Sequence, residues 1–213
     1  MLWQRLIDEW QLSPIEAKYI DRQQGEFCAK CGSNLRSIVL AKALCAVFRT
    51  RETLSAFVDS PEAALFSILE LNTAGTLNPI LSRMSKRVFG AYPEVDMHAL
   101  PYGDMSFDVV VHSDTLEHVA NPVHALCECR RVLKLGGALC FTVPIVVGRL
   151  SRDRDGLPKS YHGDPNETRD DYLVHTEFGA DAWAYVMEAA FSEISLFSLD
   201  YPTALAIAAY RHS

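Results

Sequence analysis

Histidine, tyrosine and acidic side chains are concentrated in the segment 159–177. Tyr161 and His162 lie near its start, and Tyr172 and His175 lie towards its end. A histidine with an unperturbed pKa of about 6.5 can take up or release a proton near neutral pH without special burial. We predict that either histidine could serve as a general base and that either tyrosine could orient it. A solvated or structural histidine is the alternative at both positions.

A second group with potential chemistry is the turn that follows the apolar run 65–71. The segment 68–77 reads Ile-Leu-Glu-Leu-Asn-Thr-Ala-Gly-Thr-Leu, so an acid, Glu70, precedes small residues that end at Gly75. The N–H groups of such a turn, together with a carboxylate, can face a small molecule. A plain strand-to-helix turn is the alternative. No Gly-x-Gly-x-x-Gly is present, which argues against a standard dinucleotide site.

Two of the six cysteines have metal-ligand spacing, Cys28 and Cys31. They supply half of a zinc knuckle, whereas a closed zinc site requires four ligands. No second Cys-x-x-Cys occurs, and Cys127 and Cys129 would point in different directions from one helix. We therefore predict no bound metal and a reduced thiol pair, with zinc as the alternative.

Short apolar runs predict the strands that position these groups. The runs 65–71, 107–111 and 138–143 are mostly apolar without regular alternation, which is typical of parallel strands buried on both faces. Asn121-Pro122 predicts the start of a helix between the last two runs, and Gly136-Gly137 its end. Strand, helix and strand then form a right-handed parallel crossover.

The two ends of the chain have different patterns. Residues 181–190 predict a helix, and the runs 194–199 and 204–210 predict an antiparallel pair. The first sixty residues have helical spacing, including an amphipathic helix from residue 35 to 48, and we interpret 1–60 as a helical cap on an α/β domain over 61–213. The polar segment 148–176 follows the strand that ends at Pro144, on the side where open sheets bind ligands.

Composition excludes several function classes. The chain has 213 residues, 49% of them hydrophobic, and a formal charge of −7, so nucleic acid and anionic membranes are not expected partners. The apolar runs are far shorter than the ~20 residues of a membrane helix. The first ten residues lack the layout of a signal peptide, and we expect a cytoplasmic protein.

One long motif resembles a known family. The segment 96–119 reads Asp-Met-His-Ala-Leu-Pro-Tyr-Gly-Asp-Met-Ser-Phe-Asp-Val-Val-Val-His-Ser-Asp-Thr-Leu-Glu-His-Val, and 131–137 reads Arg-Val-Leu-Lys-Leu-Gly-Gly. Both resemble the class I S-adenosylmethionine-dependent methyltransferases of the methyltransferase type 11 kind. The resemblance implies a Rossmann-like α/β fold with a mostly parallel sheet, S-adenosylmethionine as cofactor and a small-molecule acceptor.

The resemblance also implies roles for individual residues. Glu70 matches the acid that helps to hold the methionine end of the cofactor, and Asp96 matches the acid that accepts from the adenine amino group. The other implied cofactor contacts are Asn72, Gly75, Met97, Ser113 and Asp114. In this setting we assign His162 as the general base and Tyr161 and His175 to the acceptor.

Two departures from the family pattern favour a rival function. Asn72, Ala74 and Thr76 stand where the family usually has glycines, which lets side chains crowd the cofactor. Only the segment 77–95 separates this turn from Asp96, which is short for the helices and strands that the family has there. In the family, an acid at the end of the second strand binds the ribose hydroxyls of the cofactor. The candidate for this acid in the present sequence is Glu94. The alternative is a catalytically degenerate, methyltransferase-like binding protein.

Overall fold

A six-stranded sheet forms the centre of the structure, a computed structural model that describes residues 2, 4–163 and 166–212. The strand order is β2-β1-β3-β4-β9-β8, with β2, β1, β3 and β4 parallel and β9 antiparallel to both β4 and β8. The strands are β1 (Ile68–Leu71), β2 (Arg87–Gly90), β3 (Phe107–Ser113), β4 (Leu133–Thr142), β8 (Glu193–Leu199) and β9 (Ala204–Tyr210). The predicted fold class is confirmed.

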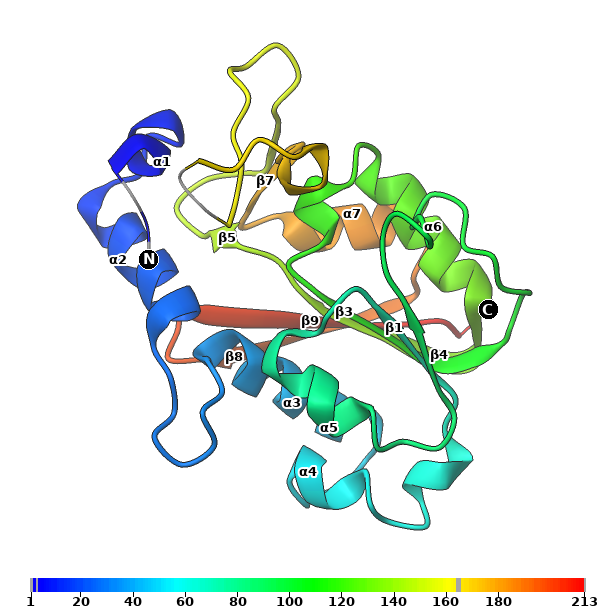
Figure 1. The fold of residues 1–213 in the computed structure, drawn as a ribbon. Helices are drawn as coiled ribbons and strands as arrows, with labels where there is room; N and C mark the ends of the chain where they lie inside the picture. The colour runs from blue at the N-terminus through cyan, green and yellow to red at the C-terminus, as the bar shows by residue number, and fades with distance from the viewer. Residues whose placement is uncertain (1, 3, 164–165, 213) are drawn as a thin grey trace.

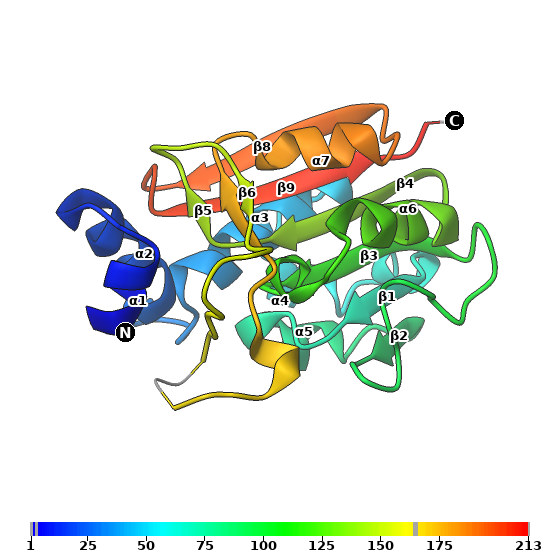
Figure 2. The same cartoon turned by 90° about the horizontal axis from the view of Figure 1, so that it is seen from above.

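Helices cover both faces of this sheet (Figures 1 and 2). On one face α6 (Pro122–Val132) and α7 (Ala182–Glu188) share a core with β1, β3 and β4, because their apolar stripes face the strands. On the other face lie α3 (Leu35–Val47), α4 (Leu54–Phe57) and α5 (Asn78–Leu81). The chain therefore folds into three layers.

Only part of the first sixty residues lies apart from the sheet. The helix α3 buries Val39, Leu40 and Leu44 in the same core as β1, β3 and β9, so it is a layer helix rather than part of a cap. By contrast, α1 (Gln4–Glu9) and α2 (Pro14–Gly25) form a small core of their own against Val146 and Val174. The division of the chain at residue 60 stays a prediction.

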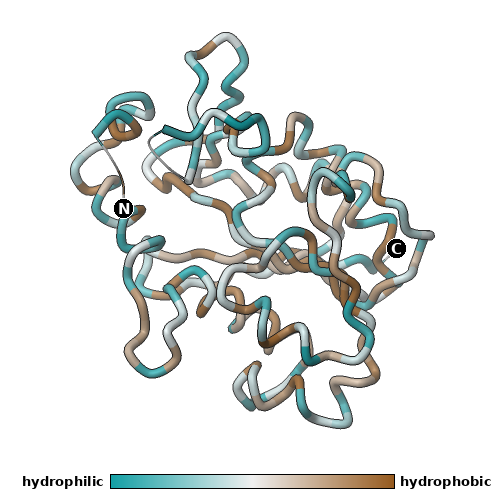
Figure 3. Tube along the Cα trace, viewed as in Figure 1, coloured by the Kyte–Doolittle hydropathy of each residue, from teal (hydrophilic) through white to brown (hydrophobic). Residues whose placement is uncertain are grey.

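The segment after β4 is more ordered than the predicted loop. It contributes to a small second sheet in the order β5-β7-β6, made of β5 (Ile145–Val146), β6 (Arg152–Asp153) and β7 (Thr176–Gly179). In Figure 3 the hydrophobic stretches gather along the central strands, whereas the loop that projects at the top is mostly hydrophilic. Among the described residues, no helix is both long and apolar enough to cross a membrane.

The predicted end of α6 was wrong. The helix ends at Val132, and Gly136 and Gly137 lie inside β4. The Arg211 guanidinium donates to the carbonyls of Arg130 and Leu133 and so satisfies the end of the helix without a glycine cap. Gly136, at φ +79°, instead donates its N–H to the Arg211 carbonyl at the edge of the sheet.

Candidate active site

A cavity of about 530 Å³ lies at the carboxyl ends of β1 and β3. Leu71 and His112 are register partners, so these two parallel strands end at the same edge and present the following turns side by side. The sequence-predicted residues that line this cavity are Asn72, Asp96, Met97, Ser113, Asp114 and His175. Residues chosen from separate segments of the chain therefore meet in one place.

Asn72 occupies the first position of the turn after β1 in the left-handed conformation, with φ +54°. Asparagine is one of the few residues besides glycine that adopts this conformation readily, which explains how the turn forms without the usual glycine. Its Oδ1 accepts from the Tyr92 N–H at 3.0 Å, and its Nδ2 lies 3.5 Å from Thr115 Oγ1. The side chain thus joins the ends of β1, β2 and β3.

Glu70 and Gly75 do not line the cavity. The Glu70 carboxylate is fully buried behind the turn, where it accepts from the Ala74 N–H at 2.9 Å and from Arg87 Nε at 2.7 Å. Gly75, at φ +55°, lies against α3, and a Cβ there would meet Ser37 Oγ at 2.7 Å. Glu70 fixes the shape of the turn, and Gly75 permits its close packing.

Asp96 presents an ionised carboxylate to the cavity. Its Oδ1 accepts from the His98 N–H at 2.8 Å and contacts His98 Nδ1 at 3.0 Å. The Asn121 N–H donates to His98 Nε2, so Nδ1 carries the proton and donates to Asp96. These two bonds hold the pKa of Asp96 below its usual value. Both bonds use Oδ1, and among the described residues Oδ2 makes no hydrogen bond.

Asp114 is held by side chains from the first sixty residues. Gln24 Nε2, on α2, donates to Asp114 Oδ2 at 2.8 Å, and the Arg36 guanidinium, on α3, forms an ion pair with the same oxygen. Ser113 Oγ lies 2.8 Å from Thr142 Oγ1 at the end of β4. Sequence reasoning missed Gln24 and Arg36, because nothing in the helical pattern distinguishes them from solvated residues.

The late segment forms the opposite wall of the cavity. His175 lies there beside Asp170, Asp171 and Tyr172, which form a single 3-10 turn. The His175 N–H donates to the Glu117 carbonyl at 2.8 Å, which ties this wall to the end of β3. Of the two predicted acceptor-binding residues, His175 lines the cavity and Tyr161 does not.

Tyr161 and His162 lie outside the cavity lining. Tyr161 pairs with Leu173 in an isolated β-bridge. His162 packs on Trp10 with 5.3 Å between ring centroids, and its Nδ1 lies 3.8 Å from Glu117 Oε1. The adjacent Asp164-Pro165 of the predicted segment lies outside the described residues.

The cysteine pair shows no third ligand. All six cysteines are free thiols, and hydrogen bonding from the backbone of Cys31 and Lys30 lowers the pKa of Cys28. Among the residues that the structure describes, the one group of three or more metal-ligating side chains is Glu117, His118 and His162. Cys28 and Cys31 therefore remain a two-ligand pair within the described chain.

Comparison with known proteins bears on this arrangement. The sequence pattern of the methyltransferase domain family matches residues 76–141. An uncharacterized 37.1 kDa protein in transposon Tn4556 of Streptomyces fradiae is 47% identical over 49 residues, which cover 23% of this chain and 14% of that protein.

Solved methyltransferase structures are similar to this chain. The DszA carbon methyltransferase superposes with a TM-score of 0.50 at 14% identity and covers 83% of this chain and 53% of that one. An S-adenosylmethionine-dependent methyltransferase of Thermotoga maritima gives a TM-score of 0.47 at 15% identity over 96% of each chain. The chain is therefore similar to the class I methyltransferases in the sequence of residues 76–141 and in its fold. For a class I methyltransferase the implied methyl donor is S-adenosylmethionine.

Proposed function

We propose that the chain transfers a methyl group from S-adenosylmethionine to a small-molecule acceptor. The observation that carries this proposal is the meeting of Asn72, Asp96 and Ser113, from three separate segments, in one cavity at the carboxyl edge of the sheet. Open α/β sheets bind ligands at this edge. The family match over residues 76–141 covers two of these three segments, because it includes Asp96 and Ser113.

The cavity fits the donor in charge and in size. The Asp96 carboxylate is ionised, and its Oδ2 can accept from an exocyclic amino group, as the resemblance implies for adenine. A volume of about 530 Å³ lies within the range of small-molecule pockets, roughly 300–1,000 Å³. When bound, the donor supplies an electrophilic methyl group; the residues of the chain must orient both ligands and exclude water.

His175 is the proton acceptor in this proposal. It lines the cavity, whereas the imidazole of His162 packs against Trp10 and Glu117 and has no place in the lining. His118 also lines the cavity, but its Nδ1 donates to the Leu173 carbonyl and its Nε2 faces Glu117. A base must reach the proton that it removes, so placement favours His175 over His162. Tyr161 stays a predicted acceptor contact.

A small acceptor is favoured over a macromolecule. In this proposal the methyl donor and the acceptor share the same cavity, and Tyr172 and His175 line the part assigned to the acceptor. A net charge of −7 gives no general attraction for nucleic acid.

A binding protein without turnover is the second candidate, and Asn72 is the observation that favours it. Where a glycine would leave room, the Asn72 side chain bridges Tyr92 and Thr115 at the wall of the cavity. Binding of S-adenosylhomocysteine with no methyl transfer to any acceptor tested would favour this candidate.

Titration calorimetry with S-adenosylhomocysteine tests cofactor binding. We expect Asp96→Ala to weaken binding by about 10-fold or more, because a charge-assisted hydrogen bond contributes roughly 1.5–3 kcal/mol. Asp59→Ala is the matched control, since Asp59 is an exposed acid that pairs with Arg83 and does not line the cavity. Equal affinity in both variants would contradict the assigned site.

A further inference from the structure

Glu117 is a buried carboxylate without a hydrogen-bond partner. The residue lies on the 3-10 turn Leu116–His118 after β3 and is 1% exposed. Neither Oε1 nor Oε2 accepts a hydrogen bond from any described residue. Burial of an ionised carboxylate is unfavourable unless the carboxylate is paired with a cation or bound to a metal, so Glu117 calls for a positive charge in direct contact.

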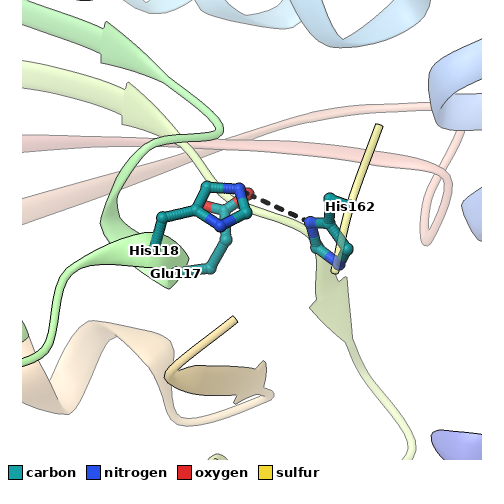
Figure 4. A group of neighbouring side chains, drawn as sticks. All are labelled: Glu117, His118 and His162. Carbon is teal, nitrogen blue, oxygen red and sulfur yellow. Dashed lines mark ion pairs between the residues drawn. The ribbon is translucent and has the colours of Figure 1, made fainter. Parts of the chain in front are cut away.

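Two imidazole nitrogens face the same carboxylate oxygen. His118 Nε2 lies 3.7 Å from Glu117 Oε1, and His162 Nδ1 lies 3.8 Å from it (Figure 4). The three ligand atoms all lie within 4.8 Å of one another. Hydrogen bonds between these atoms would be about 2.7–3.2 Å long. Two ligands at ~2.1 Å from a tetrahedral metal ion lie roughly 3.4 Å apart, which is closer to the observed spacing.

The hydrogen bond of His118 prepares its other nitrogen for a metal. Nδ1 lies 3.0 Å from the Leu173 carbonyl, which can only accept, so Nδ1 carries the proton. The neutral ring then presents a lone pair at Nε2, on the side of Glu117. Metal-binding histidines are held by a backbone carbonyl in the same way.

His162 is also held in place from outside the cluster. Its ring packs on Trp10, and its backbone N–H donates to the Tyr172 carbonyl at 3.1 Å. The nearby cation Arg36 is already paired with Asp114 and does not neutralise Glu117 through a hydrogen bond. The ligand set is thus one carboxylate and two imidazoles from two separate segments.

We propose that Glu117, His118 and His162 bind a divalent transition-metal ion such as zinc. Two nitrogens and one oxygen suit zinc, cobalt, manganese or iron(II) rather than magnesium, which prefers oxygen ligands. Three protein ligands leave a coordination position open. Because His118 lines the cavity, the ion lies at the cavity wall. The metal site itself does not depend on the proposed methyl transfer.

Zinc titration of the full chain tests this site. The protein is prepared with Cys28→Ser and Cys31→Ser, to remove the thiol pair, and is stripped with a chelator. We expect one zinc per chain by calorimetry, and a visible absorption band when cobalt replaces zinc. Glu117→Gln and His162→Ala should each weaken zinc binding by at least about 100-fold, since even the loss of a residue that supports a metal ligand costs 10–100-fold.

The control is a histidine–carboxylate pair of ordinary geometry. His212 Nε2 lies 2.9 Å from Glu193 Oε2 at an exposed position, and His212→Ala should leave zinc affinity unchanged. Circular dichroism establishes that the variants are folded; if Glu117→Gln does not fold, His162→Ala decides the question. No heat at millimolar zinc, or unchanged affinity in His162→Ala, would overturn the proposal. The zinc titration contains no methyl donor, so its result does not depend on whether the chain transfers methyl groups.

Discussion

His112 should make the protein sensitive to mild acid. Its side chain is completely buried in β3, stacked on Phe141 with 5.0 Å between ring centroids. Neither ring nitrogen has a partner among the described residues. Desolvation of the charged form lowers the pKa of His112 from 6.5 to about 4.

The sign and size of the effect follow from linkage. In the unfolded chain His112 takes up a proton near pH 6.5, whereas in the folded protein it stays neutral down to about pH 4. Stability from this residue is therefore present above pH 6.5 and is lost as the pH falls towards 4. Between about pH 7.5 and about pH 5 the loss amounts to ~2 kcal/mol, at 1.36 kcal/mol for each pKa unit.

Urea unfolding of the wild type and of His112→Phe measures this loss. The phenyl ring keeps the stacking on Phe141 and removes the titrating group. We expect the free energy of unfolding of the wild type to fall by ~2 kcal/mol more than that of the variant between about pH 7.5 and about pH 5. Because both proteins contain the other histidines, the contribution of those residues to the pH dependence of the free energy of unfolding cancels in the comparison. Equal losses would refute the reasoning.

Two further predictions concern β7 and the acceptor side. Gly179→Ala should reduce the free energy of unfolding by at least about 2 kcal/mol, because the new Cβ would lie 2.2 Å from the Arg149 carbonyl oxygen; Gly103→Ala, with its nearest atom at 3.5 Å, is the control in urea titrations. His175→Ala should lower kcat by roughly 10²-fold without changing affinity for S-adenosylhomocysteine in calorimetry; unchanged kcat would exclude His175 as the base.

The sequence predicted the central strands β1, β3 and β4 because most of their residues are buried. The runs that became β1, β3 and β4 have no polar alternation, and the tight link between β8 and β9 predicts antiparallel pairing. The helix α3 was misplaced in a cap, because an amphipathic pattern shows that a face is buried but not against what. The end of α6 was mispredicted because its last carbonyl groups accept hydrogen bonds from Arg211, which is distant in the sequence.

The candidate site was predictable where one motif carries it. Asp96, Ser113 and Asp114 belong to a continuous segment that leads into and out of β3, so a parallel sheet brings them to one edge. The cluster of Glu117 with His162 depends on how the segment after β4 folds back over that edge. No local periodicity encodes this contact.

A crystal structure of the full chain with S-adenosylhomocysteine tests the central claim most directly. We predict electron density for the ligand between Asn72 and Ser113, with the adenine amino group within hydrogen-bond distance of Asp96 Oδ2 and the sulfur on the side that faces His175. Density for the ligand elsewhere, or an empty cavity at saturating ligand, would contradict the assignment of this cavity as the methyl-donor site.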